Sequence, residues 1–217
     1  MKNDGSVVTW GYEYGGGNSG SVSSELSSGV TQIFSSPLAF AALKSDGSVV
    51  TWGNSNNGGV SSSVSSELSS GVVEIFSNYG AFAAIKSDGS VVTWGDSNNG
   101  GDSSSVSSEL NSGVVGIFSH THGTAFAALK SDGSVVTWGA SSDGGDSSSV
   151  SSQISSGVTE IFSTNYAFAA LKSDGSVVTW GHSDYGGDSN SVTSSISSGV
   201  QNVYSSSKAF AALDNDG

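Results

Sequence analysis

Short apolar runs alternate along this chain with polar, glycine-rich stretches. In the second full repeat the runs are Val-Val-Glu-Ile-Phe-Ser at 72–77, Ala-Phe-Ala-Ala-Ile at 81–85 and Ser-Val-Val-Thr-Trp-Gly at 90–95. Runs of this length that are rich in Val, Ile, Phe, Thr and Trp favour β-strands over helices. The pattern therefore predicts three strands in each repeat.

The same three runs return at a fixed interval. Tryptophan stands at positions 10, 52, 94, 138 and 180, which is a period of 42 residues with one interval of 44. Asp-Gly separates the second run from the third, and Asp-Gly between two β-rich runs is a strong hairpin signal because glycine accepts a positive φ. A period of this length indicates a repeat architecture.

The predicted strands are apolar on both faces. Phe40 and Ala42 point to one side of their strand, and Ala41 and Leu43 point to the other. A sheet that is apolar on both faces must be covered on both, and radial packing of sheet against sheet achieves this. We therefore predict an all-β fold, a single β-propeller domain that spans residues 1–217. The segment after each polar loop, such as Val64–Val72, is compatible with a short outer strand or with one helical turn.

The two ends of the chain complement each other in sequence. The last repeat has the runs at 200–205 and 209–213 but no Val-Val-Thr-Trp run after them, and Ser6–Trp10 is such a run without the other two. We expect these segments to pair and to close a five-bladed propeller, with a closing blade shared by residues 1–29 and 198–217. An open array would leave two raw sheet edges. A closed ring would be a monomer.

Composition limits the class of partner. Six basic residues stand against nineteen acidic ones, the formal net charge is −13, and there is no Arg. Nucleic acids are bound through Lys and Arg that displace phosphate counterions, so we expect no nucleic-acid partner. No apolar run is long enough to cross a bilayer, and no signal peptide precedes the first repeat. The absence of Cys removes disulfides and Cys-zinc sites.

The repeats resemble the regulator of chromosome condensation family. The residues that carry the resemblance are Ala-Phe-Ala-Ala-Ile-Lys-Ser-Asp-Gly at 81–89 and Ser-Val-Val-Thr-Trp-Gly at 90–95, and all five repeats follow this order. The short period is similar to that of bacterial members. The chain departs from the family in having Ser where the family has Gly after the first strand, and Phe near the position of the family's His. The resemblance implies a propeller that binds partners through its loops.

Comparison of the repeats shows where they diverge. The Asp-Gly turns and the Ser-Gly-Val segments are nearly constant, and in an up-and-down blade they lie on one face. The divergent loops would share the opposite face, which we take as the candidate binding face because loops carry function on a rigid scaffold. Random drift of unconstrained loops explains the divergence equally well. The candidate binding residues on these loops are Tyr79, His120, His122, Asn165, Tyr166 and Tyr185.

Signals for metal and catalytic chemistry are weak. His120 and His122 could share a metal, but no third ligand is evident, so we expect a polar loop and no metal site. The spacing of Asp96, Asn98, Gly100 and Asp102 is similar to a calcium loop but lacks the bidentate Glu. No nucleophile motif is present, and we predict neither catalytic residues nor a cofactor. The protein is not expected to be an enzyme.

The sequence therefore predicts a non-enzymatic binding or scaffold protein that recognises another protein through its variable loop face. A lectin with one shallow glycan site per repeat and a purely structural module of a larger bacterial surface protein are the alternatives. The style of the repeats suggests the outside or the surface of a bacterial cell. The incomplete repeats at both ends also fit a piece of a longer repeat protein.

Overall fold

The computed structural model describes residues 2–214 as five antiparallel sheets that follow one another along the chain. Four sheets have three strands in the order first–second–third, and the last has two. The strands are β1 (Val30–Ser35), β2 (Ala39–Lys44) and β3 (Val49–Gly53); β4 (Val72–Ser77), β5 (Ala81–Lys86) and β6 (Val91–Gly95); β7 (Val114–Phe118), β8 (Ala125–Lys130) and β9 (Val135–Gly139); β10 (Val158–Ser163), β11 (Ala167–Lys172) and β12 (Val177–Gly181); and β13 (Val200–Ser205) and β14 (Phe210–Asp214).

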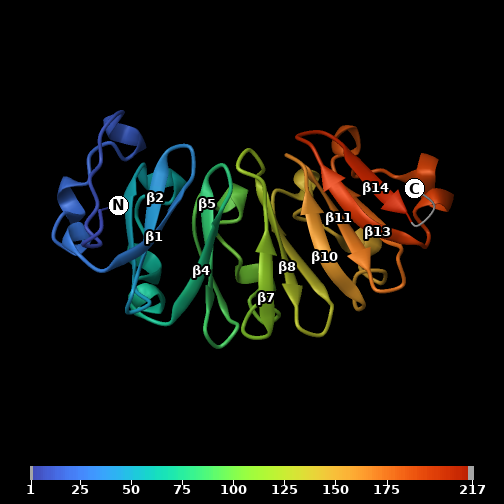
Figure 1. Cartoon of the computed structure of the whole chain (residues 1–217), viewed down its shortest axis with the longest axis horizontal. Helices are drawn as coiled ribbons and strands as arrows, with labels where there is room; N and C mark the ends of the chain where they lie inside the picture. Colours follow the sequence, from blue (N-terminus) through green and yellow to red (C-terminus); the bar gives the residue numbers. More distant parts are fainter. Residues whose placement is uncertain (1, 215–217) are drawn as a thin grey trace.

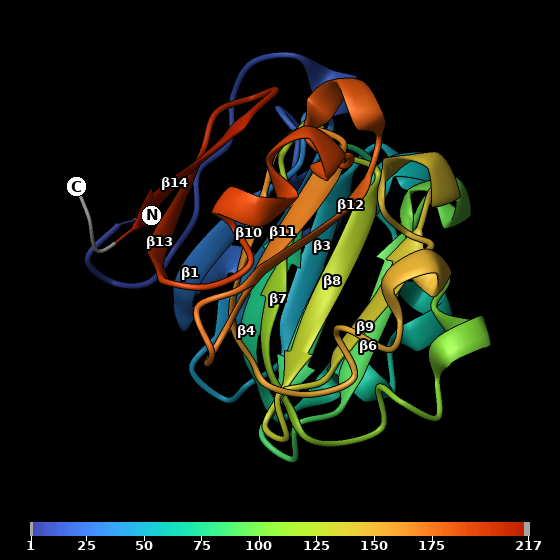
Figure 2. The same ribbon diagram turned by 90° about the vertical axis from the view of Figure 1, so that its right-hand side faces the viewer.

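The segments that the sequence left open between strand and helical turn form no strand among residues 2–214 and contain short 3-10 helices and turns, and the polar loops before them hold further 3-10 helices. They follow the third strand of each repeat and lie to one side of the sheets, while the first strands β1, β4, β7 and β10 lie on the other side (Figure 2). The 3-10 helices are η1 (Glu13–Gly15), η2 (Gly20–Val22), η3 (Glu25–Ser27), η4 (Ser55–Asn57), η5 (Ser62–Val64), η6 (Glu67–Ser69), η7 (Ser97–Asn99), η8 (Ser104–Val106), η9 (Ser141–Asp143), η10 (Ser148–Val150), η11 (Ser183–Tyr185) and η12 (Asn190–Ser195). None of the helices in residues 2–214 has the length and apolar run needed to cross a bilayer.

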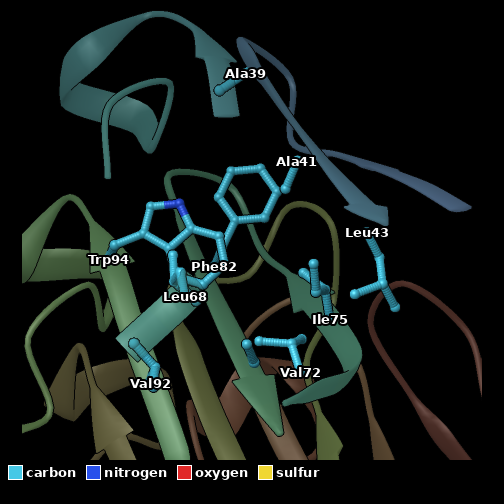
Figure 3. Packing of buried hydrophobic residues seen from close by; sticks show 10 residues of the cluster. Ala39, Ala41, Leu43, Leu68, Val72, Ile75, Phe82, Val92 and Trp94 are labelled. Atoms are coloured by element: carbon cyan, nitrogen blue, oxygen red, sulfur yellow. The ribbon is translucent and has the colours of Figure 1, made fainter. Parts of the chain in front are cut away.

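The core lies between neighbouring sheets, as the two-faced strand pattern predicted. Ala41 and Leu43 of one sheet pack against Ile75, Phe82 and other side chains of the next. Figure 3 shows the Phe82 ring beside that of Trp94, with Ala41 approaching from β2. The alanines of β2, β5, β8 and β11 are 0–2% exposed, and their small size lets the sheets approach closely. These features are consistent with β-propeller architecture.

Each third strand is anchored by its tryptophan. The Trp94 indole stacks on Phe82 with ring centroids 5.3 Å apart, and its N–H donates to the Gly58 carbonyl over 3.1 Å. Gly58 has a φ of +92°, and a Cβ there would lie 2.5 Å from the Phe82 ring, so both the backbone and the close contact require glycine. The same arrangement recurs at Trp52, Trp138 and Trp180.

The predicted closing sheet is not formed. β13 and β14 form a two-stranded sheet, and Ser6–Trp10 is not paired in any sheet among the described residues. The sheets form an open arc, with Ser6–Trp10 at one end of its long axis and β14 at the other (Figure 1). The prediction of closure within one chain is corrected accordingly. Complementary sequences show that two ends can pair, but the relative rotation of successive sheets decides whether they meet.

Candidate functional site

The two sets of divergent loops share one face, as predicted. We call this the loop face and define it by residues 36–38, 78–80, 120–124, 164–166 and 206–208 together with 54–59, 96–101, 140–145 and 182–187. The second predicted set also included residues 12–19, which follow Ser6–Trp10 and are left out of the definition because they belong to no complete sheet. In each complete sheet a residue of the second set donates its backbone N–H to a carbonyl of the first. His182 donates in this way to Tyr166 over 2.8 Å, and Asp96 donates to Gly80 over 2.9 Å. The Asp-Gly turns lie at the opposite ends of the strands, where they form hydrogen bonds with the Ser-Gly-Val segments. For example, the Val72 N–H donates to the Gly47 carbonyl.

Serine hydroxyls join the bases of the loops from one sheet to the next. Ser77 Oγ donates to the Ser35 carbonyl over 2.8 Å, Ser119 Oγ to Ser77 over 2.9 Å, and Ser163 Oγ to Ser119 over 3.2 Å. We call these bonds the serine ladder. The sequence analysis did not predict the serine ladder. The available signal was the serine that follows Ile-Phe in each of these runs, at the position where the resembled family has glycine. The ladder fixes the spacing of the loops that stand on it.

Two of the predicted residues come together in an aromatic cluster. The rings of Tyr166 and Tyr185 meet edge to face with centroids 4.6 Å apart. His182 lies 5.2 Å from the Tyr185 ring, and Lys208 Nζ stands 5.5 Å from the centre of that ring. An ammonium at this distance is attracted by the ring quadrupole. We call these four residues the tyrosine cluster.

Sequence reasoning missed two members of the tyrosine cluster. His182 occupies a position where the other repeats have Tyr12, Asn54, Asp96 and Ala140, so the signal available was that it is the one histidine at this position. Lys208 is the one lysine of the sequence that stands in a divergent loop. Of the other five lysines, four directly precede Ser-Asp-Gly and one is the second residue of the chain. The cluster joins three separate loops, and only the fold brings them together.

Asn165 stands beside the tyrosine cluster and is held by its backbone. Its N–H donates to the Ser207 carbonyl over 3.1 Å. Its side-chain Oδ1 is buried and has no hydrogen-bond partner within residues 2–214. An unmatched buried acceptor costs roughly 1–3 kcal/mol, so this oxygen is a local cost to the folded state. Both tyrosines of the cluster are half-buried, which leaves part of each ring to a partner.

The remaining three predicted residues lie on the next two loops. Tyr79 is 45% exposed, and its backbone N–H donates to the Gly123 carbonyl over 3.0 Å. His120 and His122 have ring centroids 5.8 Å apart, and His120 Nδ1 accepts from the His122 N–H. Partial burial, with a smaller contribution from neighbouring His122, lowers the pKa of His120. No group of three or more His, Cys, Asp or Glu within residues 2–214 is arranged to hold a metal ion.

The two groups of predicted residues meet at Gly123. A Cβ at this position would lie 2.7 Å from the Asn165 carbonyl oxygen, so the close approach of the two loops requires glycine. The loop face therefore carries a continuous stretch from Tyr79 through His120 to Tyr166 and Tyr185.

The calcium-like spacing has a structural explanation. Asp96 Oδ1 accepts from the Asn98 N–H at the start of η7, and Asp102 Oδ1 accepts from the Ser104 N–H at the start of η8. Asp188 accepts from the Asn190 N–H in the same way before η12. Short side chains at these positions satisfy the first free N–H groups of a helical turn. The carboxylates serve separate turns and do not converge.

Comparison with known proteins gives structural likeness without a family assignment. No family model and no curated protein matches the sequence. Solved structures that superimpose on the chain include human WBSCR16, with 19% identity, 86% of this chain and 52% of that chain covered, and a TM-score of 0.49. They also include Prp20p from Saccharomyces cerevisiae, whose binding to Gsp1p and histones has been examined, with 14% identity, 86% and 50% coverage, and a TM-score of 0.48.

A third similar structure is the ectodomain of the receptor kinase CR4 from Physcomitrella patens, with 16% identity, 70% and 39% coverage, and a TM-score of 0.45. The chain spans about half or less of the length of these three proteins. All three TM-scores are below 0.5, so these likenesses assign no function to this chain. The resemblance to the chromosome-condensation regulators stays a prediction from the repeated residues.

Proposed function

We propose that this protein is a non-enzymatic scaffold that binds another protein through the loop face, with the tyrosine cluster at the centre of the contact. The observation that carries the proposal is that Tyr166, Tyr185 and Lys208 converge from three loops. Aromatic side chains supply large contact area at low entropic cost and dominate the energetic centres of protein interfaces.

The loops that present the cluster are held firmly. The serine ladder joins the base of loop 164–166 to the base of loop 120–124 through the bond from Ser163 to Ser119. Backbone bonds then tie loop 164–166 to the other two loops of the cluster: Asn165 N–H donates to the Ser207 carbonyl, and His182 N–H donates to the Tyr166 carbonyl. A preorganised surface loses little conformational entropy when it binds. The net charge of −13 favours a partner whose contact surface is neutral or basic.

The cluster occurs once, which favours protein recognition over a repeated glycan site. The positions equivalent to Tyr166 are Leu38, Gly80, Thr124 and Lys208, and those equivalent to Tyr185 are Gly15, Asn57, Asn99 and Asp143. A lectin with one site per repeat needs the same contact residues in each repeat. A single asymmetric patch suits one protein partner.

The test compares two double variants in affinity capture from the producing cells and on a glycan array. The double variant Tyr166→Ala with Tyr185→Ala should lose at least about 30-fold in affinity for the captured protein, the effect of removing an aromatic hot spot. The matched control is Tyr12→Ala with Tyr14→Ala, which removes a second tyrosine pair with centroids 5.9 Å apart on the loop after Ser6–Trp10. It should bind like the parent protein.

Thermal unfolding of both variants checks that they remain folded. Equal capture by both double variants would contradict the proposal. Specific glycan binding that disappears in Tyr166→Ala would replace protein recognition by the lectin alternative.

A further inference from the structure

The two ends of the arc carry the two halves of a contact that the interior repeats four times. In each complete sheet the third strand pairs with the second, and its Trp stacks on a Phe and donates to a Gly carbonyl 3.0–3.1 Å away. The register is constant, as Phe168 faces Trp180, Ala169 faces Thr179 and Ala170 faces Val178.

The β14 end has the Phe and the Gly of this contact. Phe210 and Gly186 are in contact distance, since a Cβ on Gly186 would lie 2.7 Å from the Phe210 ring, as at Gly58 and Phe82. Beside them is a hollow of about 410 Å³ that is lined by Val177, Phe210 and Ala212 among others. No described residue forms a third strand there.

The other face of β14 is uncovered as well. Ala211 and Leu213 are exposed, with Leu213 at 43%, whereas the equivalent Ala169 and Leu171 are buried against the next sheet. Tyr204 on β13 is 57% exposed at the position of Phe162. This end therefore presents an apolar sheet face and an open strand edge together.

The Ser6–Trp10 end has the complementary half. Trp10 is 83% exposed, whereas the four other tryptophans are 2–3% exposed. Ser6–Trp10 already has the placement of a third strand relative to the following sheet, because Val30 N–H donates to Gly5 as Val72 N–H donates to Gly47. Ile33 on β1 is 37% exposed where Ile75 is 2%, so the facing sheet surface is also uncovered.

We propose that copies of this chain associate head to tail, with Ser6–Gly11 of one copy adding as the third strand to β14 of another. Trp10 then faces Phe210, Thr9 faces Ala211 and Val8 faces Ala212. The Trp10 indole fills the hollow beside Phe210 and donates to the Gly186 carbonyl. Ala211 and Leu213 of the copy that provides β14 cover Ile33 and Phe40 of the copy that provides Ser6–Gly11. This contact between two molecules reproduces the strand pairing and sheet-to-sheet packing that join neighbouring sheets inside one chain.

A second copy is the occupant that the geometry favours. The chain's own Ser6–Trp10 lies at the far end of the long axis from β14 (Figure 1). A strand added to an open edge gains main-chain hydrogen bonds and side-chain pockets at once. Because the contact joins two different surfaces, each added copy leaves one free end of each kind, and the products are rings or filaments. This differs from the monomer that the sequence predicted on the assumption of closure within one chain.

The first test uses two variants that each disable one end. Trp10→Ala removes the side chain that fills the hollow, and Ala211→Glu places a charge on the exposed face of β14. Sedimentation of the parent protein over a range of concentrations should show mass that rises with concentration. Each variant alone should associate at least about 30-fold more weakly. An equimolar mixture should form a dimer and stop there, because it contains one intact pair of ends. The control Tyr14→Ala should behave like the parent.

The second test fixes the register with disulfides in a chain that has no cysteine of its own. Thr9→Cys and Ala211→Cys in one chain place thiols at directly opposite positions of an antiparallel pair, within disulfide reach. Oxidation should give covalent dimers and larger species on a non-reducing gel. Thr9→Cys with Leu213→Cys, two residues out of register, should give few.

Two results would overturn the inference. A parent protein of monomer mass at every concentration, with the Thr9→Cys and Ala211→Cys chain cross-linking only to itself, would show closure within one molecule. A mixture of the two end variants that stays monomeric while the parent associates would place the contact elsewhere on the surface.

Discussion

At the scale of the residue, the five tryptophans show that one sequence motif has two fates. Trp94 is 2% exposed, stacks on Phe82 and donates to Gly58, whereas Trp10 is 83% exposed within the same Val-Val-Thr-Trp-Gly motif. The difference is the neighbouring second strand, which Trp94 has and Trp10 lacks. The motif is thus a framework element whose contribution depends on the strand beside it.

The same substitution should therefore have unequal costs at the two positions. Trp94→Ala should lower the free energy of unfolding by about 3–5 kcal/mol, since it removes a buried aromatic side chain and leaves a cavity. Trp10→Ala should change it by less than about 0.5 kcal/mol in dilute solution, where the chain is dissociated. Urea unfolding of both variants at low protein concentration measures the difference. Equal losses would mean that Trp10 is buried in the dissociated chain.

At the scale of the element, the Asp-Gly turns are stabilised by an ionised carboxylate. Asp88 Oδ1 accepts from both the Ser90 hydroxyl, at 2.6 Å, and the Ser90 N–H, at 2.9 Å. These two bonds lower the pKa of Asp88 below its ordinary value, and the same cause lowers the pKa of Asp46, Asp132 and Asp174. The lysine before each turn donates to a backbone carbonyl of the preceding helical or turn segment, as Lys86 does to Glu67, the first residue of η6.

The turns should therefore make stability depend on acid pH. A carboxyl whose pKa is lower in the folded state than in the unfolded state stabilises the folded state when it is ionised. Its contribution to the free energy of unfolding is fully present above the unfolded pKa of about 3.9 and is lost as the pH falls through the folded pKa. The free energy of unfolding should be level above about pH 5 and decline below it. Urea titrations at a series of pH values measure this decline.

Asp88→Asn is the matched control for the turn. Asparagine keeps an acceptor oxygen for Ser90 but does not titrate, so the variant should show a smaller decline in stability below about pH 5 than the parent. An unchanged slope would assign the acid sensitivity to other carboxyls.

At the scale of the whole molecule, each core cluster spans one sheet or two adjacent sheets, so stability is a sum over neighbours along the arc. The serine ladder is the polar part of that neighbour coupling. It runs across the bases of the loops and connects the loop face to the framework.

Removal of one rung should weaken the array measurably. Ser119→Ala deletes the donor to the Ser77 carbonyl and should reduce the free energy of unfolding by roughly 0.5–1.5 kcal/mol, the net contribution of one hydrogen bond. The exposed Ser63→Ala in η5 should change it by less than about 0.5 kcal/mol. Urea unfolding of the two variants provides the comparison, and equal effects would show that the ladder contributes no stability.

Much of the fold followed from local and repeated signals. The pattern around Ala81–Ile85 and Ser90–Gly95 predicted a hairpin with an Asp-Gly turn and two apolar faces, and the structure confirms each of these. The grouping of the divergent loops on one face followed from strand alternation. The outer segments stayed undecided, because Ser-rich sequences with single apolar residues satisfy a short strand and a 3-10 turn equally well.

Other features needed the tertiary structure. The sequence alone determined the repeat, the strands and the tryptophan framework, because these depend on residues close together in the chain or identically placed in every repeat. The tyrosine cluster combines residues from three loops, and His182 and Lys208 are recognised as members only when those loops are placed in space. The open arc was likewise decided by the structure, since the rotation between sheets accumulates over the whole array and no single residue specifies its sum.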